Sequence, residues 1–257
     1  MSGISAAPDA EFAGRRILLT GATGSIGRAT ARILAESGAH VVLNGRDAGK
    51  LEKLAGELPN GSCTMAPFDL ADGDGIPGWL QSIAEKNGPF AGAVHAAGMQ
   101  IMKPLRSMTA EFVNLNLRTN VSGGIMLGKG LRQKGCHTEG ASLVLISSTA
   151  VYIGGAGNVA YAASKGAVIS ATKAMAHELV RDKIRVNCVV AGLVESGMSE
   201  RARAITPADS WGTVLSGYPM GIGKPDDIAY AIVYLLSDRA EWITGTDLQI
   251  DGGLALA

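Results

Sequence analysis

Residues 16–27 read Arg-Ile-Leu-Leu-Thr-Gly-Ala-Thr-Gly-Ser-Ile-Gly, and this stretch decides the fold. Its first half is an apolar run that predicts a buried strand, and a segment with helical periodicity follows the glycines. A glycine-rich turn between a first strand and a helix lets backbone N–H groups approach a pyrophosphate, whose charge the helix N-terminus stabilises. The stretch therefore predicts a dinucleotide-binding turn. The alternative is a tight turn with a purely structural role.

The same alternation of short apolar runs and helical segments continues along the whole chain. Continuous apolar strands are typical of a parallel sheet that is covered on both faces. We therefore predict a single α/β domain over residues 14–257, a Rossmann-like doubly wound sheet of seven parallel strands, preceded by a disordered tail over residues 1–13. The predicted strands cover residues 16–20, 40–44, 63–68, 91–95, 142–147, 184–190 and 247–250. The predicted helices lie near residues 26–37, 48–57, 76–87, 109–133, 160–181 and 226–237.

Residues 193–219 break this rhythm. The segment is long and mixed in character, and we expect it to be irregular. Long irregular segments in compact domains often serve as lids or binding loops, and the alternative is a mobile surface loop.

Composition excludes several classes of function. Lysine plus arginine and aspartate plus glutamate number 23 each, so the net charge is zero and gives no footprint for nucleic acid or an anionic membrane. The three cysteines show no CxxC spacing, which argues against a zinc site or a disulfide framework and fits a reducing compartment. The N-terminus lacks the pattern of a signal peptide, and no apolar stretch approaches the length of a membrane span. We predict a cytoplasmic protein without a metal.

A second motif, Ser148-(x12)-Tyr161-x-x-x-Lys165, follows an apolar strand that ends at the serine. Tyr161 and Lys165 are one helical turn apart and share a face. An ammonium about 4 Å from a phenolate attracts it by about 4 kcal/mol at an effective dielectric of ~20. This is an upper limit of roughly three pKa units, so we expect Lys165 to lower the pKa of Tyr161 and make it a general acid/base. The motif is short, and its weight comes from its surroundings.

The end of the second predicted strand, Leu43-Asn44-Gly45-Arg46-Asp47, bears on the choice of dinucleotide. Sites that prefer NAD usually place an acidic side chain here to bind the ribose 2′-OH. Arg46 can instead pair with a 2′-phosphate, which predicts NADP(H) in preference to NAD(H). The alternatives are that Arg46 is solvated or that it stacks on the adenine.

With the glycine turn and the tyrosine–lysine pair both in place, the chain resembles the single-domain branch of the short-chain dehydrogenase/reductase family, and is similar to 3-oxoacyl-[acyl-carrier-protein] reductases. The resemblance covers roughly residues 14–254. Further matching motifs are Phe68-Asp69-Leu70, His95-Ala96-Ala97-Gly98, Asn120 within Thr119–Gly123, Ile184–Asn187, Gly192, Ser196, Pro225–Ala229, Ile243–Gly245 and Asp251–Gly253.

The resemblance implies interconversion of a ketone and a secondary alcohol by hydride transfer, without a metal. It implies that Tyr161 is the acid/base, that Lys165 lowers its pKa and binds the nicotinamide ribose, that Ser148 orients the carbonyl, and that Asn120 holds a water of a proton relay. The cofactor contacts that it implies are Gly21, Thr23, Ser25, Ile26, Gly27, Arg46, Asp69, Leu70, Ala97, Gly98, Tyr161, Lys165, Gly192, Val194 and Ser196.

Substrate contacts are expected from Tyr152, Met198 and Trp211. Tyr152 could equally be a core aromatic, and methionine is a general gap-filler. The substrate is a small-molecule carbonyl or alcohol, with a 3-oxoacyl thioester as one option. Glu139 and Asp182 stand where carrier-specific reductases tend to present docking arginines.

Three residues or groups depart from the family pattern. The glycines follow a spacing more typical of the longer epimerase branch, with Ser25 at a usual glycine. His95 and Ala96 replace asparagines, and we expect His95 to be a hydrogen-bonding residue at a strand end rather than an acid/base. Ala191 replaces a proline.

Two other functions stay open: a sugar-nucleotide epimerase or dehydratase, and a non-catalytic dinucleotide-sensing protein. Family members bury the helices that match residues 109–133 and 160–181 in a four-helix interface, which implies a homodimer or homotetramer.

Overall fold

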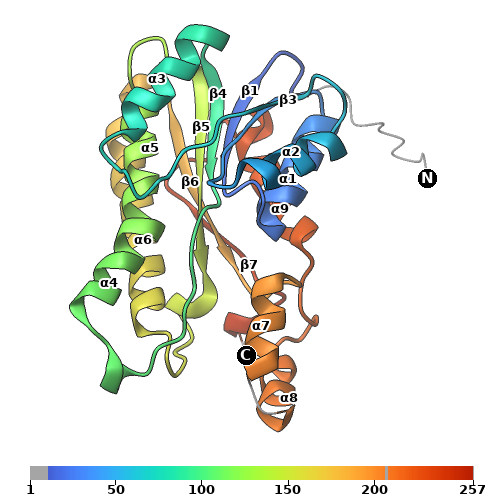
Figure 1. Cartoon of the computed structure of the whole chain (residues 1–257), viewed down its shortest axis with the longest axis vertical. Coiled ribbons are helices and arrows are strands. Elements are labelled where there is room, and N and C mark those ends of the chain that lie inside the picture. The colour runs from blue at the N-terminus through green and yellow to red at the C-terminus, as the bar shows by residue number, and fades with distance from the viewer. Residues whose placement is uncertain (1–10, 206–207, 257) are drawn as a thin grey trace.

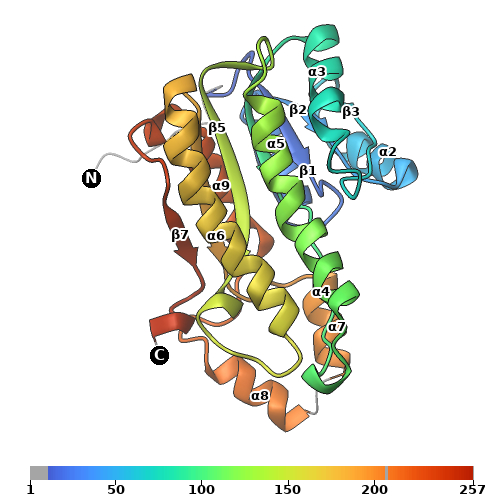
Figure 2. The same cartoon turned by 90° about the vertical axis from the view of Figure 1, so that its left-hand side faces the viewer.

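The computed structural model describes residues 11–205 and 208–256. These residues form one parallel sheet with the strand order β3-β2-β1-β4-β5-β6-β7, and helices cover both of its faces (Figure 1 and Figure 2). The predicted doubly wound, seven-stranded parallel sheet is confirmed. The strands are β1 (Arg16–Thr20), β2 (His40–Leu43), β3 (Cys63–Met65), β4 (Phe90–His95), β5 (His137–Ser148), β6 (Arg185–Ala191) and β7 (Asp247–Ile250). The helices are α1 (Ser25–Glu36), α2 (Ala48–Glu57), α3 (Ile76–Asn87), α4 (Ala110–Leu117), α5 (Gly123–Leu131), α6 (Val159–Leu179), α7 (Gly197–Ile205), α8 (Ala208–Ser216) and α9 (Pro225–Leu236).

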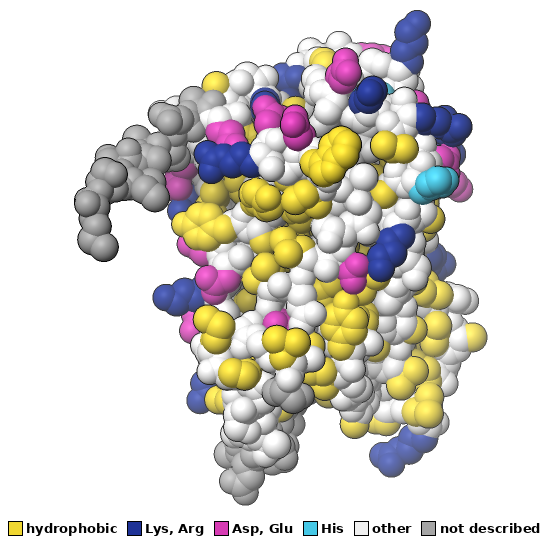
Figure 3. Space-filling model, turned by 180° about the vertical axis from the view of Figure 1, so that it is seen from behind, with side chains coloured by type: hydrophobic (Ala, Val, Ile, Leu, Met, Phe, Trp, Pro, Cys, Tyr) yellow, Lys and Arg dark blue, Asp and Glu magenta, His cyan; other side chains and the backbone are white. Residues whose placement is uncertain are grey.

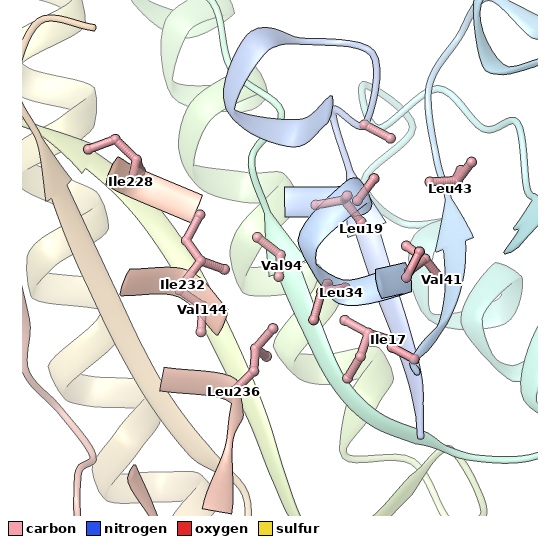
Figure 4. Packing of buried hydrophobic residues seen from close by; sticks show 14 of the residues in the cluster. Ile17, Leu19, Leu34, Val41, Leu43, Val94, Val144, Ile228, Ile232 and Leu236 are labelled. Atoms are coloured by element: carbon pink, nitrogen blue, oxygen red, sulfur yellow. The ribbon is translucent and has the colours of Figure 1, made fainter. Parts of the chain in front are cut away.

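Side chains of β1 enter both layers of the core. Ile17 and Leu19 are fully buried in a cluster that includes Ile232 of α9 (Figure 4), whereas Leu18 is buried on the other face with Leu127 of α5. Burying a side chain of this size stabilises the fold by about 1.5–3 kcal/mol. Burial on both faces explains why the strand reads as a continuous apolar run.

The strand order places a topological switch point beside β1. This strand lies between β2 and β4, so the chain leaves β1 in one direction and later returns on its other side. In open parallel sheets, ligands bind outside the carboxyl ends of the strands at such a point. The glycine turn follows β1 at this edge, and the connections after β4, β5 and β6 emerge there as well.

The segment predicted to be irregular, residues 193–219, contains two helices, α7 and α8. Ser196 caps the first of them, because its Oγ accepts a hydrogen bond from the backbone N–H of Ser199 at 3.0 Å. The prediction of an irregular segment is wrong, because both helices have an amphipathic pattern comparable to that of α9, which the mixed composition of the segment hides.

Other boundaries differ by a few residues. Phe12 is fully buried and its N–H donates to the carbonyl of Ser37, so packing begins before the predicted boundary at residue 14. Residues 1–10 lie outside the described part of the chain. The helix predicted over residues 109–133 is divided into α4 and α5 by a π-helical turn, Arg118–Ser122.

Candidate active site

Ser148, Tyr161 and Lys165 come from two elements that pack against each other, β5 and α6. Ser148 is the last residue of β5, and its Oγ accepts a hydrogen bond from the N–H of Ala150 at 3.2 Å. Tyr161 and Lys165 lie one turn apart near the start of α6, with Nζ of Lys165 5.7 Å from the centroid of the Tyr161 ring. The two elements therefore bring the strand-end serine to the tyrosine and lysine of the helix.

Two hydrogen bonds in opposite directions fix Lys165 against β5. Its Nζ donates to the carbonyl of Ile146 at 2.8 Å, and the hydroxyl of Ser147 donates to the carbonyl of Lys165 at 2.8 Å. The lysine is buried, so the position of its ammonium is set by the strand rather than by solvent.

Burial dominates the acid–base properties of this pair. It raises the pKa of Tyr161, and the Ser148 hydroxyl acts in the opposite direction. Burial also lowers the pKa of Lys165 to about 8. The expectation that the ammonium lowers the pKa of Tyr161 is wrong for this structure, because Nζ points at the Ile146 carbonyl while the phenol is largely removed from water.

Asn120 lies in the π-helical turn between α4 and α5 and is buried. Its Oδ1 accepts from the N–H of Met99 at 2.8 Å, and its Nδ2 donates to the Met99 carbonyl at 3.0 Å and to the Ser164 hydroxyl at 2.9 Å. The side chain thus ties the connection after β4 to α6. Both N–H groups of the side chain are used in these bonds, so the water expected at Asn120 stays a prediction that concerns its oxygen atoms.

The predicted phosphate contacts Gly21, Thr23, Ser25, Ile26 and Gly27 all lie in the turn from β1 into α1. Gly21 has a φ of +63°, and a Cβ there would lie 2.5 Å from the N atom of Ala97. A Cβ on Gly27 would lie 2.2 Å from the carbonyl oxygen of Gly21. Gly24 provides no side-chain cap for α1, so a phosphate can satisfy the first N–H groups of the helix.

At the end of β2, the structure separates Asn44 from Arg46. Asn44 is buried, and its Nδ2 donates to two backbone carbonyls beyond β3 at 3.0 and 3.2 Å. Arg46 is exposed and has no ion pair among the residues that the structure describes. Asp69 is also exposed, whereas the side chain of Leu70 is buried. Of these residues, Arg46 and Asp69 have side chains open to a ligand.

Gly98 lies beside the ammonium of Lys165. It is exposed and follows Ala97 in the connection after β4. A Cβ at Gly98 would lie 3.4 Å from Nζ of Lys165 and 3.3 Å from Oδ1 of Asn120. A side chain at Gly98 would therefore contact both the ammonium of Lys165 and the amide of Asn120.

Gly192, Val194 and Ser196 follow β6 at the same edge. A Cβ on Gly192 would lie 2.7 Å from the Cα of Asp251, so this position requires glycine. Val194 is buried and forms an isolated parallel bridge with Gly223. Because its side chain is buried, Val194 can reach a cofactor only through its backbone.

Of the three expected substrate residues, the structure describes the side chains of Tyr152 and Trp211. Tyr152 is about half exposed, and its hydroxyl donates to Asp247 at the start of β7 at 3.1 Å. Asp247 also pairs with Lys173 of α6 at 3.1 Å. Tyr152 is therefore not a core residue, and its hydroxyl is engaged at the edge of the sheet. Trp211 is partly exposed on α8, and the side chain of Met198 lies outside the described part of the chain.

Sequence reasoning missed Tyr218 and Thr20. The Tyr218 hydroxyl accepts a hydrogen bond from the N–H of Leu193 at 3.1 Å and so holds the segment that leaves β6. The Thr20 hydroxyl lies 3.1 Å from Nδ1 of His95. A polar residue at the end of an apolar strand is a usable signal for Thr20, but nothing in the local sequence marks Tyr218.

Within residues 11–205 and 208–256, no helix is long and apolar enough to cross a membrane. The same residues contain no group of three or more His, Cys, Asp or Glu side chains placed to hold a metal ion.

Comparison with known proteins gives consistent matches over nearly the whole chain. A family model described as Enoyl-(Acyl carrier protein) reductase matches residues 21–255. The 3-oxoacyl-[acyl-carrier-protein] reductase FabG of Thermotoga maritima is 32% identical, over 95% of this chain and 98% of the relative. The L-xylulose reductase of Mesocricetus auratus is 33% identical, over 95% of this chain and 98% of the relative.

A solved structure from Brucella melitensis, titled as a short-chain dehydrogenase/reductase and glucose/ribitol dehydrogenase, has a TM-score of 0.87 and 31% identity. The match covers 95% of this chain and 98% of that one.

Proposed function

Because the chain belongs to the short-chain dehydrogenase/reductase family of NAD(P)-dependent oxidoreductases, we propose that it interconverts a ketone and a secondary alcohol with NADP(H) as its preferred cofactor. The observation that carries the proposal is the junction of β5 and α6, where Ser148, Tyr161 and the buried Lys165 meet. When bound, the nicotinamide would supply or accept the hydride.

The three side chains have separate tasks in this reaction. Ser148 orients the substrate carbonyl through its hydroxyl, and Tyr161 exchanges a proton with the carbonyl oxygen. Since burial raises the pKa of Tyr161, the phenol holds its proton at neutral pH and is ready to act as the acid in the direction of ketone reduction. Lys165, whose Nζ donates to the Ile146 carbonyl, binds the nicotinamide ribose, and the Ser148 hydroxyl is the group that favours the phenolate form of Tyr161.

Arg46 supports NADP(H) as the cofactor. It is exposed, lacks an ion pair among the described residues and follows β2, where Asn44 uses its own amide inside the fold. No acidic side chain occupies residues 44–46, so a guanidinium is the charged group available to a 2′-phosphate.

Exposed apolar side chains support a substrate with an apolar portion, such as a 3-oxoacyl thioester. They lie on connections at the carboxyl edge of the sheet and on α8, and they are Ile101, Met102, Leu105, Ile153, Val214, Leu215 and Met220. The connection after β4 and the connection before α6 are joined at this edge, because the N–H of Lys103 donates to the Gly157 carbonyl at 2.9 Å. Apolar surface of this kind at a binding edge favours an acyl chain over a polyol.

A ketone panel tests the proposed reaction. NADPH absorbance is followed with acyl thioesters, alkyl ketones of increasing length and a ketose such as L-xylulose, with Ser148→Ala as the variant and natural protein as reference. We expect acyl and alkyl ketones to be reduced and Ser148→Ala to lose activity on all of them. A protein that binds NADPH but reduces none of the panel would favour the non-catalytic alternative.

Arg46→Ala and the charge-conserving Arg46→Lys test the cofactor. Loss of a charge-assisted contact of about 1.5–3 kcal/mol would weaken NADPH at least tenfold, whereas NADH should change little. Thermal shifts with each cofactor measure this directly, since binding to the native state raises apparent stability. Equal losses for the two cofactors would contradict the NADP(H) assignment.

We also propose a homodimer or homotetramer in the cytoplasm. Exposed apolar side chains on α4, α5 and α6, which lie side by side in Figure 2, support a helical interface; they are Leu115, Ile125 and Val159. The face opposite to that of Figure 1 also carries many apolar side chains (Figure 3). The three cysteines are unpaired, which fits a reducing compartment. Light scattering of the purified protein would test the assembly.

A further inference from the structure

His95 is a buried imidazole that the proposed reaction does not use. It ends β4 and is 2% exposed. Its Nδ1 lies 3.1 Å from the hydroxyl of Thr20, the residue directly before Gly21. Its Nε2 makes no hydrogen bond within 3.5 Å to a described residue, and the backbone of Thr119 is the polar group that favours a proton on the ring. A polar atom buried in this way is uncommon and calls for an explanation.

Two neighbouring glycines make room for the ring. A Cβ on Gly123 would lie 3.0 Å from Cε1 and 3.4 Å from Nε2 of His95, and one on Gly124 would lie 3.1 Å from Cδ2. The backbone at Gly123 is ordinary α-helix, with φ −55° and ψ −45°, and the next neighbour of its Cβ position is Leu70 at 3.8 Å. The ring of His95 is therefore the group that limits a side chain at Gly123.

The position of these glycines connects the ring to the active site. They directly follow the π-helical turn that carries Asn120, and Asn120 holds Met99 and Ser164. Ser164 is the neighbour of Lys165 in α6. His95 thus lies between two turns. On one side it contacts Thr20, which precedes the phosphate-binding turn. On the other side it contacts Gly123, which follows the Asn120 turn.

The imidazole is neutral in this position. Burial lowers the pKa of His95 to about 3, and the charge of Lys165 acts in the same direction, whereas the backbone of Thr119 acts in the opposite direction. The Thr20 hydroxyl lies 3.1 Å from Nδ1 and also donates to the Val94 carbonyl at 3.3 Å. The ring therefore contacts the residue before the phosphate-binding turn through Nδ1 and faces Gly123 through Cε1 and Nε2.

We propose that His95 is a positioning residue that holds the phosphate-binding turn and the Asn120 turn in register. The inference rests on the proposed reaction, because one of its effects is read through Lys165 and Asn120. Displacement of the Asn120 turn changes kcat, and loss of the Thr20 contact changes the affinity for NADPH. A residue that served only to fill the core would change stability without separating these two quantities.

A double-mutant cycle with His95→Asn and Gly123→Ala tests the contact between ring and turn. Asparagine keeps a polar atom near Thr20 but lacks the ring edge, so it leaves space at Gly123. We expect Gly123→Ala alone to lower kcat about tenfold, since small displacements in an active site are costly, and to lower Tm. In the His95→Asn background the same change should raise both kcat and Tm, because alanine is a better helix former than glycine. Equal effects of Gly123→Ala in both backgrounds would overturn the proposal.

Thr20→Val and the matched control Thr20→Ser test the other side of the ring, including the case in which Gly123→Ala does not fold. We expect the valine variant to raise the Kd of NADPH about fivefold to tenfold in fluorescence titrations, with the serine variant close to the natural protein. Equal affinities of the two variants would contradict the proposal.

Tyr161→Phe separates a failure of this inference from a failure of the proposed function. If Tyr161→Phe keeps its activity, the proposed function fails, and the NADPH titrations still decide the role of His95. If Tyr161→Phe is inactive and the cycle shows no coupling, only the inference about His95 fails.

Discussion

The junction of β5 with α6 and the segment of α7 and α8 lie at the same edge of the sheet and are built in opposite ways. At the junction, Lys165 and Ser147 are buried and exchange hydrogen bonds with backbone carbonyls. In the helical segment, Val214 and Leu215 are 41% and 38% exposed, and the following Met220 is 85% exposed. Figure 1 shows α7 and α8 projecting beyond the sheet.

This difference indicates which region sets the type of reaction and which region selects the substrate. Groups that take part in the chemistry need fixed geometry, and the rigid junction provides it. A segment with few buried contacts can change its sequence at little cost to the fold. We therefore infer that the junction sets the reaction and that α7, α8 and Met220 select the substrate.

The largest expected effect comes from Tyr161→Phe, which removes the proton donor while keeping the ring. General acid/base catalysis contributes about 10²–10⁴-fold, so kcat should fall by this factor while the Kd of NADPH changes little. Steady-state kinetics and a fluorescence titration measure the two quantities. A kcat within threefold of the natural value would show that the junction of β5 with α6 does not set the reaction.

Asn120→Ala should weaken the fold as well as the reaction. Each polar group of Met99 and Ser164 left without its partner costs about 1–3 kcal/mol, so we expect the free energy of unfolding to fall by about 2 kcal/mol. Asn114→Ala provides a matched control on the exposed part of α4. Urea unfolding measures both, and equal stabilities would show that the Asn120 contacts do not hold the junction.

Lys165→Met should abolish activity yet stabilise the protein at pH 7. A pKa lowered from 10.5 to about 8 by burial corresponds to a cost of at most about 3 kcal/mol at neutral pH, and loss of the bond to Ile146 offsets about 1 kcal/mol. We expect a net gain of about 1–2 kcal/mol in urea unfolding without cofactor.

The stability difference between Lys165→Met and the natural protein should depend on pH. Between about pH 8 and 10.5 the unfolded chain binds more protons at Lys165 than the folded chain does, so the stability of the natural protein rises with pH in this window. The advantage of Lys165→Met should therefore shrink across it. A difference that is constant with pH would show that burial of the ammonium carries no cost.

Met220→Ser should have the smallest effect on the fold. Because Met220 is 85% exposed, the free energy of unfolding should change by less than about 0.5 kcal/mol. We expect KM for apolar ketones to rise severalfold and kcat to stay nearly constant. A change in kcat with constant KM would contradict this division of roles, because it would assign Met220 to the chemical step.

The sequence predicted the parts of the fold whose signal is local. Buried strands such as β1 and β6 are continuous apolar runs, and Gly21 and Gly27 stand where only glycine fits. Helices α7 and α8 were missed because each has only 9 residues and lies in a segment of mixed composition, where a short apolar period is hard to recognise.

The site was predicted in its residue identities and less well in its interactions. Ser148, Tyr161 and Lys165 are recognisable by type and spacing. The direction of the Lys165 ammonium and the bonds of Asn120 to Met99 depend on backbone groups that no spacing reveals. Likewise, the hydroxyl of Tyr152 is engaged by Asp247, which is 95 residues away in the chain.

Transfer of deuterium from NADPH labelled at C4 of the nicotinamide tests the central claim most directly. The ketone that the natural protein reduces fastest is incubated with each C4 epimer of the labelled cofactor, and the alcohol is analysed by mass spectrometry. We predict that one epimer transfers its label to the carbinol carbon, and that Tyr161→Phe nearly abolishes the product. Cofactor oxidation without label in the alcohol, or unchanged transfer by Tyr161→Phe, would contradict the account.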